Sequence, residues 1–155
     1  LKLNEIAYEI AKYIEDRGHG AFPVFFLPMT FLPPDDEESK RSILTTPNFS
    51  SVPAAIEAGL GERGLNNLLI TPQYGPRVRL IAVITDAPLH PDKTRREKLC
   101  PGLECGVCLE ACPSGALARE GSHDWVLCNQ HHNAHLHLLG YGSCSMCMQV
   151  CPLPQ

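Results

Sequence analysis

The chain has 155 residues, a formal net charge of −4 and a pI of about 6.0. A chain of this length forms one domain or two small ones. Recognition of nucleic acid by charge is not expected, because the sequence has no basic stripe and no basic tail. A membrane segment is not expected either, because no apolar run approaches the roughly 20 residues that a membrane helix needs.

The first predicted element is a helix. Apolar residues recur at helical spacing between Leu3 and Ile14, and charged residues lie off that face. Gly18 and Gly20 are expected to end the helix. Because the helical pattern starts at the first residue and the sequence has no initiator methionine, we expect the chain to be N-terminally incomplete.

A strand, a loop and a second helix are predicted next. The apolar residues 24–27 indicate a short strand, and residues 28–52 are expected to form a long loop. Residues 53–58 predict a helix with a proline in its first turn.

Two further strands are predicted at residues 67–71 and 77–85, joined by a turn at residues 72–76. The second strand is nearly all apolar after Arg79, so we expect it to be buried on both faces. A polar linker at residues 86–99 leads to the cysteines.

Three glycines, Gly59, Gly61 and Gly64, form a literal G-x-G-x-x-G run. The dinucleotide-binding fingerprint follows a strand and opens a helix, whereas this run follows a predicted helix and precedes a strand. A tight helix-to-strand turn, or a close approach of the backbone to a flat cofactor, explains the glycines better. We therefore take them, together with Tyr74 in the following turn, as candidate cofactor-binding residues.

All eight cysteines lie between residue 100 and residue 151. Six of them form two copies of the pattern Cys-x2-Cys-x3-Cys-Pro, while Cys100 precedes the first copy and Cys128 precedes the second. Four soft thiolates that converge on one point are the ligand set of a cubane iron–sulfur cluster. The cysteines therefore predict two 4Fe–4S clusters and a role in electron transfer.

In bacterial two-cluster ferredoxins the cysteine before the proline ligates the other cluster. The same crossing is predicted here. The ligands expected for the first cluster are Cys100, Cys105, Cys108 and Cys151. The ligands expected for the second cluster are Cys112, Cys128, Cys144 and Cys147. Cys100 departs from the ferredoxin spacing because residues 101–104 are inserted after it, but this insert is turn-rich and can loop out.

Zinc binding and disulfide formation are two alternative roles for the cysteines. Paired Cys-x2-Cys motifs also hold zinc, and disulfides form in oxidising compartments. The two Cys-Pro endings favour clusters, because neither a zinc site nor a disulfide framework requires them. Reduced thiols in this spacing favour the cytoplasm.

A histidine-rich run at residues 131–137 lies between the two motifs, and His131 and His135 share a helical face. Because eight cysteines already satisfy two clusters, we expect these side chains to be solvated or to surround the ligands rather than bind iron.

Four runs upstream of the cysteines are AAIEAGLG at residues 54–61, GLNNLLITP at 64–72, YGPRVRL at 74–80 and TDAPL at 85–89. Together they resemble the epoxyqueuosine reductase and reductive dehalogenase superfamily, in which this segment also precedes a double 4Fe–4S module. The resemblance covers roughly residues 50–152, and the helix and strand of residues 1–27 fit the region upstream.

The resemblance implies an α+β architecture. A partial nitroreductase-like α/β domain at residues 1–92 would precede a ferredoxin-like double-cluster module at residues 93–155. In characterised members a base-off cobalamin lies between the two parts and receives electrons from the clusters. The resemblance thus implies cobalamin as a further cofactor, with flavin as the alternative, and a low-potential electron donor as a partner.

The sequence departs from the epoxyqueuosine reductases at their proposed proton donor. Those enzymes carry an acidic residue before the Ala-Gly-Leu-Gly run, whereas residues 45–52 contain neither Asp nor Glu, and Glu62 and Arg63 replace a common Trp. Tyr74 and Asp86 are other candidate proton donors, although a turn and a strand end account for them. No catalytic residue is assigned.

Two functions are therefore considered. In the first, the chain is a reductase whose clusters pass single electrons to a bound redox cofactor for the reduction of a small organic substrate. In the second, it is an electron-transfer subunit that docks to a partner enzyme or larger complex and has no substrate site of its own. The missing acid favours the second. A purely structural role ranks last, because two neighbouring clusters are more than such a role needs.

Overall fold

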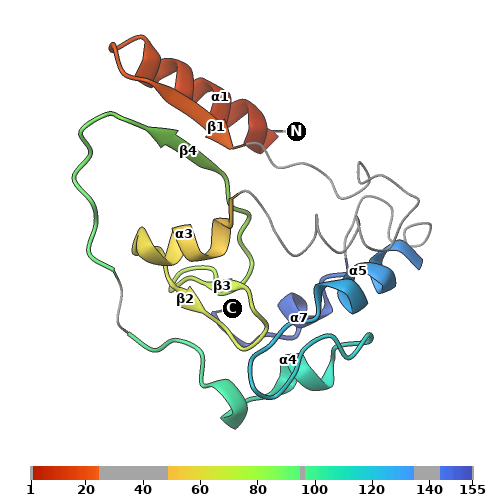
Figure 1. Cartoon of the computed structure of the whole chain (residues 1–155). Coiled ribbons are helices and arrows are strands. Elements are labelled where there is room, and N and C mark those ends of the chain that lie inside the picture. The colour runs from red at the N-terminus through yellow and green to blue at the C-terminus, as the bar shows by residue number, and fades with distance from the viewer. Residues whose placement is uncertain (1, 25–48, 95–96, 135–143, 155) are drawn as a thin grey trace.

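The computed structural model describes residues 2–24, 49–94, 97–134 and 144–154 (Figure 1). Its helices and strands are short after the first one. The helices are α1 (Lys2–Glu15), α3 (Ser51–Glu57), the 3₁₀ helix η2 (Gly102–Glu104), α4 (Val107–Glu110), α5 (Trp125–Ala134) and α7 (Met146–Gln149). The strands are β1 (Ala21–Val24), β2 (Glu62–Arg63), β3 (Leu69–Ile70) and β4 (Ala82–Thr85). None of the helices in these ranges has both the length and the apolar character that a membrane crossing requires.

Helix α1 packs against a two-stranded antiparallel ribbon of β1 and β4 (Figure 1). The predicted helix is confirmed, and Gly18 follows it with a φ of +85°, a conformation that favours glycine. Only the small residues Ala7 and Ala11 are buried on the helix. In the ribbon, Phe22 lies opposite Ile84. This group of three elements is called the helix–ribbon region below.

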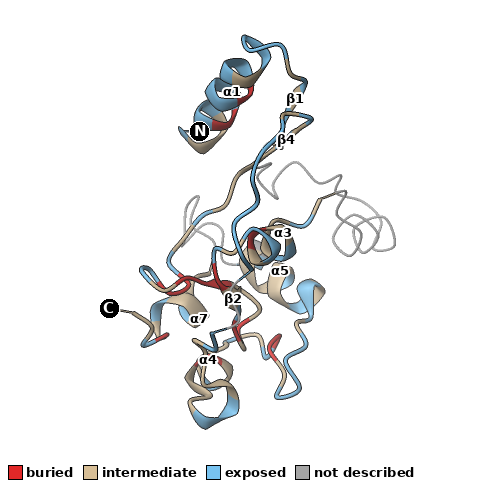
Figure 2. Ribbon diagram, turned by 90° about the vertical axis from the view of Figure 1, so that its left-hand side faces the viewer, coloured by how far each residue is buried: buried red, intermediate tan, exposed pale blue. Residues whose placement is uncertain are grey.

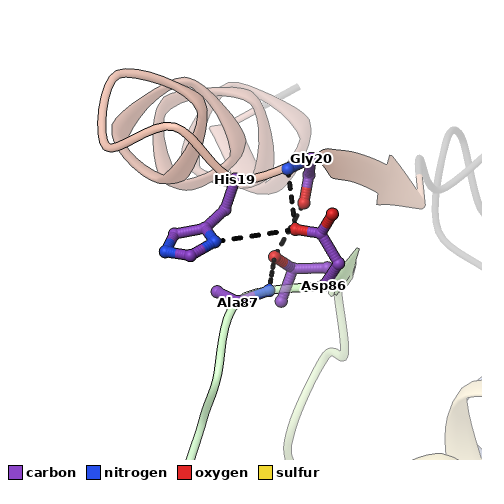
Figure 3. A network of polar contacts seen from close by, with 5 residues as sticks. His19, Gly20, Asp86 and Ala87 are labelled. Carbon is purple, nitrogen blue, oxygen red and sulfur yellow. Dashed lines mark hydrogen bonds and ion pairs between the residues drawn. The ribbon is translucent and has the colours of Figure 1, made fainter.

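Asp86 closes the end of the ribbon (Figure 3). Its carboxylate accepts a hydrogen bond of 2.8 Å from the Gly20 N–H and lies 3.8 Å from the His19 Nδ1 atom. The neighbouring Thr85 hydroxyl donates to the Gly20 carbonyl at 2.7 Å and accepts from the Ala87 N–H at 3.0 Å. These contacts give Asp86 a structural role at the strand end.

The prediction of a strand at residues 77–85 that is buried on both faces is wrong. Only Ala82–Thr85 forms a strand, and Ile84 is 52% exposed. The physical reason is that β4 belongs to a ribbon of two strands with α1 beside it, rather than to the middle of a covered sheet. The strand predicted at residues 24–27 overlaps β1 only at Val24, and residues 25–27 lie outside the described part of the chain.

The strand predicted at residues 67–71 is shorter than expected, and its partner differs. It is β3, which pairs with β2 and not with β4. The turn at residues 72–76 is confirmed, because Thr71 and Gly75 exchange two backbone hydrogen bonds of 2.9 Å across it. The helix predicted at residues 53–58 is α3, which begins two residues earlier.

The second region of the molecule combines α3, the β2–β3 hairpin and all the cysteines, and is called the cysteine-bearing region. Its best-buried side chains are in β3, where Leu69 is 2% and Ile70 is 1% exposed. Figure 2 shows the buried residues gathered here and along the inner side of α1. The short helices α4 and α7, each of which lies within a cysteine motif, pack against each other. The division of the chain into domains at residues 92 and 93 remains a prediction.

Candidate metal centres

Four cysteines line one pocket in the cysteine-bearing region. They are Cys100, Cys105, Cys108 and Cys151. The first three come from the segment around η2 and α4, whereas Cys151 follows α7 at the end of the second motif. The rest of the lining is mainly apolar and includes the buried Ile70. These are the four thiols that the crossed pattern assigns to the first cluster.

The insert after Cys100 explains how this thiol reaches the pocket. Residues 102–104 form η2, and Gly102 begins it with a φ of +68°. The Cys105 and Gly106 N–H groups both donate to the Gly102 carbonyl, at 3.2 and 3.1 Å. The insert is thus folded into a compact turn that keeps Cys100 beside Cys105.

The electrostatics of Cys108 agree with this grouping. Burial raises the pKa of its thiol, and repulsion from Cys100 and Cys151 raises it further. A thiol with a raised pKa gives up its proton reluctantly in the free protein, and bound iron stabilises the thiolate. Proton release would therefore accompany iron binding at this pocket.

The remaining four cysteines form a second group. The pKa of the Cys147 thiol is raised to about 11, first by burial and then, in decreasing order, by the charges of Cys128, Cys144, Cys112 and Cys108. Burial also raises the pKa of Cys128, followed by repulsion from Cys112 and Cys144. Cys112 belongs to the first motif in sequence but lies among the thiols of the second. The charge of Cys108 also raises the pKa of Cys147, so the two groups of cysteines lie next to each other.

Cys112 differs from its neighbours because its pKa is lowered. Burial acts to raise this pKa, but hydrogen bonds from the Ser114 side chain and from the backbone of Leu117, Ser114 and Ala116 lower it more in sum. The Ser114 hydroxyl lies 3.6 Å from the Cys112 sulfur. Hydrogen bonds of this kind favour a thiolate, which is the form that binds iron.

The donor set fits an iron–sulfur cluster better than a single metal ion. All eight cysteines are free thiols. In the described ranges, no three Cys, His, Asp or Glu side chains are arranged to hold one ion. A cubane does not require such an arrangement, because each of its four irons takes one thiolate and the ligands surround a larger body. A zinc ion would require four donors around one point.

Two polar side chains that precede the cysteines in the sequence hold the second motif in place. Arg77 donates to four backbone carbonyls, at distances between 2.7 and 3.3 Å. The acceptors are Gln149, Cys151, Leu153 and Pro154. Asn66, which is 4% exposed, donates to the Cys147 carbonyl at 3.3 Å and also lines the cysteine pocket. Neither role was predicted from the sequence.

The glycine run has a structural explanation. A Cβ atom on Gly61 would lie 2.0 Å from the Ile70 carbonyl oxygen, and one on Gly64 would lie 2.7 Å from the Ile70 side chain. Gly59 has a φ of +75°, and a Cβ there would lie 2.6 Å from the Lys93 carbonyl oxygen. The protein's own atoms therefore account for all three glycines. Tyr74 is 65% exposed, and none of these four residues lines the cysteine pocket. Cofactor binding by them remains a prediction.

Of the histidine-rich run, residues 131–134 lie in α5 and residues 135–137 lie outside the described part of the chain. Burial and then the charge of His131 lower the pKa of His132, while the backbone of Cys144 opposes the shift. His132 therefore lies near a cysteine segment.

A separate groove of about 470 Å³ lies beside α7. It is lined by Arg77, Val78, Arg79, Ser145, Met148 and Gln149. Arg79 contacts the Met148 sulfur at 3.8 Å, across the boundary between the residues before β4 and the second motif. The groove falls in the size range of small-molecule sites and has basic residues on one wall.

No protein-family model matches the chain. An epoxyqueuosine reductase of Listeria monocytogenes serovar 1/2a is 38% identical over 123 residues, which cover 72% of this chain and 31% of the relative. A tetrachloroethene reductive dehalogenase of Desulfitobacterium hafniense is 36% identical over 119 residues, which cover 75% of this chain and 18% of the relative. The chain is related to both. The resemblance seen in the sequence is thereby confirmed, although the chain spans less than a third of either relative.

Solved structures of epoxyqueuosine reductases share the fold. One, with a tRNA-Tyr epoxyqueuosine-modified tRNA stem loop, superposes with a TM-score of 0.65 at 24% identity and covers 97% of this chain and 38% of its own. Another, from Streptococcus thermophilus, has a TM-score of 0.58 at 21% identity and covers 98% and 37%. At these identities the likeness establishes a common mixed α and β fold.

Proposed function

We propose that the chain is an iron–sulfur redox protein that holds two 4Fe–4S clusters and transfers single electrons through them. The observation that carries the proposal is the position of Cys151. It belongs to the second motif, yet it lines a pocket with Cys100, Cys105 and Cys108 from the first. Two zinc-binding Cys-x2-Cys modules would not require this exchange, whereas the double-cluster ferredoxin pattern does.

The electrostatic influence of one set of cysteines on the other supports electron transfer. The charge of Cys108, in the first group, acts on Cys147, in the second. Clusters bound by these groups would be neighbours, which suits the passage of an electron from one to the other. In this proposal residues 1–92 form a nitroreductase-like α/β part, and residues 93–155 form a ferredoxin-like module that holds both clusters.

The proposed electron acceptor lies in the groove beside α7. Cys147 is in α7, and Met148 and Gln149 from the same helix line the groove. An electron leaving the second cluster would therefore reach a small molecule bound there. The basic Arg77 and Arg79 would favour an acceptor with an anionic group. A corrinoid or flavin bound in this groove would accept electrons from the cluster and deliver them to an organic substrate.

The alternative is an electron-transfer subunit without a substrate site. Two observations favour it: residues 45–52 carry no acidic proton donor, and the glycine run is filled by the protein's own atoms. Both versions of the proposal include a low-potential electron donor and a reducing, cytoplasmic setting. The reason is that all eight cysteines are free thiols, the form that a cluster requires of its ligands.

Metal analysis of protein purified without oxygen tests the common part of the proposal. We expect about eight iron and about eight sulfide per chain, with EPR signals of two reduced clusters after dithionite. About four iron would mean that only one of the two groups binds a cluster. Zinc in place of iron would contradict the proposal as a whole.

Titration with hydroxocobalamin and with flavin mononucleotide then separates the two versions. The reductase version predicts saturable binding of one of them, followed by absorbance, and weaker binding in Arg79→Met. A chain with two intact clusters that binds neither molecule would be an electron-transfer subunit.

A further inference from the structure

Cys100 needs support from outside its own motif. It lies five residues before Cys105, whereas the ferredoxin spacing would place it three residues before. The turn of η2 brings the chain back toward the pocket, but the described residues just before Cys100, 97–99, belong to no helix or strand. Some other group must therefore fix where this connection ends.

Glu62 supplies that support. It lies in β2, is half buried, and is separated from Cys100 by 38 residues. One oxygen of its carboxylate accepts a hydrogen bond of 2.7 Å from the Leu99 N–H and a second, short one from the Cys100 N–H. A charged acceptor shared by two consecutive N–H groups holds the backbone at Cys100 firmly.

We propose that Glu62 is a positioning residue for Cys100 and lowers the reduction potential of the first cluster. This inference rests on the proposed function, because it requires a cluster in the cysteine pocket. It goes further because it assigns two roles to the Glu62 carboxylate. The carboxylate positions the ligand Cys100, and it lowers the reduction potential of the first cluster.

Two physical effects lower the potential. Cluster potentials fall as negative charge accumulates nearby, because reduction adds an electron. They rise with hydrogen bonds to the sulfur atoms, and the N–H groups of Leu99 and Cys100 are directed to Glu62 instead. Both effects act on the cluster that Cys100 ligates and leave the second group of cysteines largely untouched.

The test uses Glu62→Gln, Glu62→Ala and the matched control Glu57→Gln in the same anaerobically purified chain. Glu57 is an exposed residue of α3. Its variant removes the same charge as Glu62→Gln but leaves the hydrogen bonds from Leu99 and Cys100 to Glu62 in place. Midpoint potentials are measured for both clusters by redox titration with EPR. The first cluster is identified as the signal that Cys105→Ser abolishes.

We expect Glu62→Gln to keep both clusters and to shift the midpoint potential of the first cluster upward, because the amide still accepts hydrogen bonds but carries no charge. Glu62→Ala should also lose iron from the first cluster, so that iron per chain falls toward half of the wild-type value. Glu57→Gln should leave both potentials at their wild-type values.

Unchanged potentials and iron content in both Glu62 variants would overturn the inference while the proposed function stands. So would an equal shift of both clusters, or an equal shift in the Glu57 control. A wild-type chain without clusters would overturn the proposed function itself and the inference with it. Circular dichroism of each variant establishes that folded chains are compared.

Discussion

The helix–ribbon region and the cysteine-bearing region are held together in different ways. In the first, regular backbone hydrogen bonds dominate, and the buried side chains among its described residues are the small Ala7 and Ala11, while Phe22 is 66% exposed. In the second, the helices have as few as three residues, but side chains form hydrogen bonds to backbone atoms that are distant in sequence. The comparison teaches that the amount of regular structure is a poor guide to where this molecule is tightly packed.

The largest effect is expected from exchanging single cysteines in the cysteine-bearing region. Cys112→Ser should disturb the same EPR signal as Cys144→Ser and leave the signal that Cys105 and Cys108 support, because Cys112 lies with the second group of thiols. EPR of the dithionite-reduced variants measures this. A Cys112→Ser spectrum that matches Cys108→Ser would mean that each motif closes its own cluster.

The next largest effect is expected from replacing a glycine by alanine, which should destabilise the protein more in the cysteine-bearing region than in the helix–ribbon region. In Gly61→Ala the new Cβ would lie 2.0 Å from a backbone oxygen of β3, which must then move, and we expect a loss of about 3 kcal/mol in the free energy of unfolding. In Gly20→Ala the new Cβ meets only the Asp86 side chain, at 3.4 Å, and a change below about 0.5 kcal/mol is expected.

Urea denaturation of both glycine variants provides the comparison. Iron per folded chain should be unchanged in Gly61→Ala, because the glycine serves packing. A stable Gly61→Ala chain that no longer binds cobalamin or flavin, where the wild type does, would instead assign the glycine to a cofactor.

Removing the guanidinium of Arg77 should have a moderate effect. Arg77→Met loses hydrogen bonds to four carbonyls around Cys151, but the residue is exposed, so we expect a loss of only about 2 kcal/mol. Faster loss of the first cluster to a chelator should accompany it. Arg119→Met, in an exposed turn, is the control and should leave stability and chelation rate near wild type. Equal chelation rates for the two variants would contradict the role given to Arg77.

The smallest effect concerns pH. Burial lowers the pKa of His123 below its ordinary 6.5; the charge of His132 lowers it further, and Asp124 opposes the shift. The unfolded chain therefore takes up a proton first as pH falls, so stability is complete above about pH 6.5 and is lost as pH falls through that value toward the folded-state pKa. The difference between the melting temperatures at about pH 7 and about pH 5 should be smaller in His123→Gln than in the wild type. His90→Gln, in the exposed linker, should keep the wild-type dependence.

Sequence patterns predicted the parts of the structure that depend on side-chain identity at short range. The apolar spacing between Leu3 and Ile14 gave α1, and the turn at residues 72–76 was recognised from its Pro and Gly residues. The strand at residues 77–85 was overestimated, because an apolar run does not reveal whether its faces will be covered. In the structure a ribbon of two strands leaves Ile84 exposed.

The ligand sets of the two candidate centres stay a prediction. Spacing alone indicated which cysteines belong together, and the pocket brings the first four into one place. The supporting contacts of Glu62, Asn66 and Arg77 were not predictable, because their partners are backbone groups between 37 and 81 residues away. Every residue carries such groups, so the sequence does not mark which of them a distant side chain will reach.

The exchange of cysteines between the motifs bears on how the protein would respond to air. Cys151 lies with thiols of the first motif and Cys112 with thiols of the second. A cluster held in this way joins distant segments, as a disulfide cross-link does. Oxygen that destroys one cluster would therefore release its four thiols, which come from both motifs, and loosen the surroundings of the other cluster. A chain that has lost one cluster to oxygen would therefore lose its second cluster faster than an intact chain loses its first.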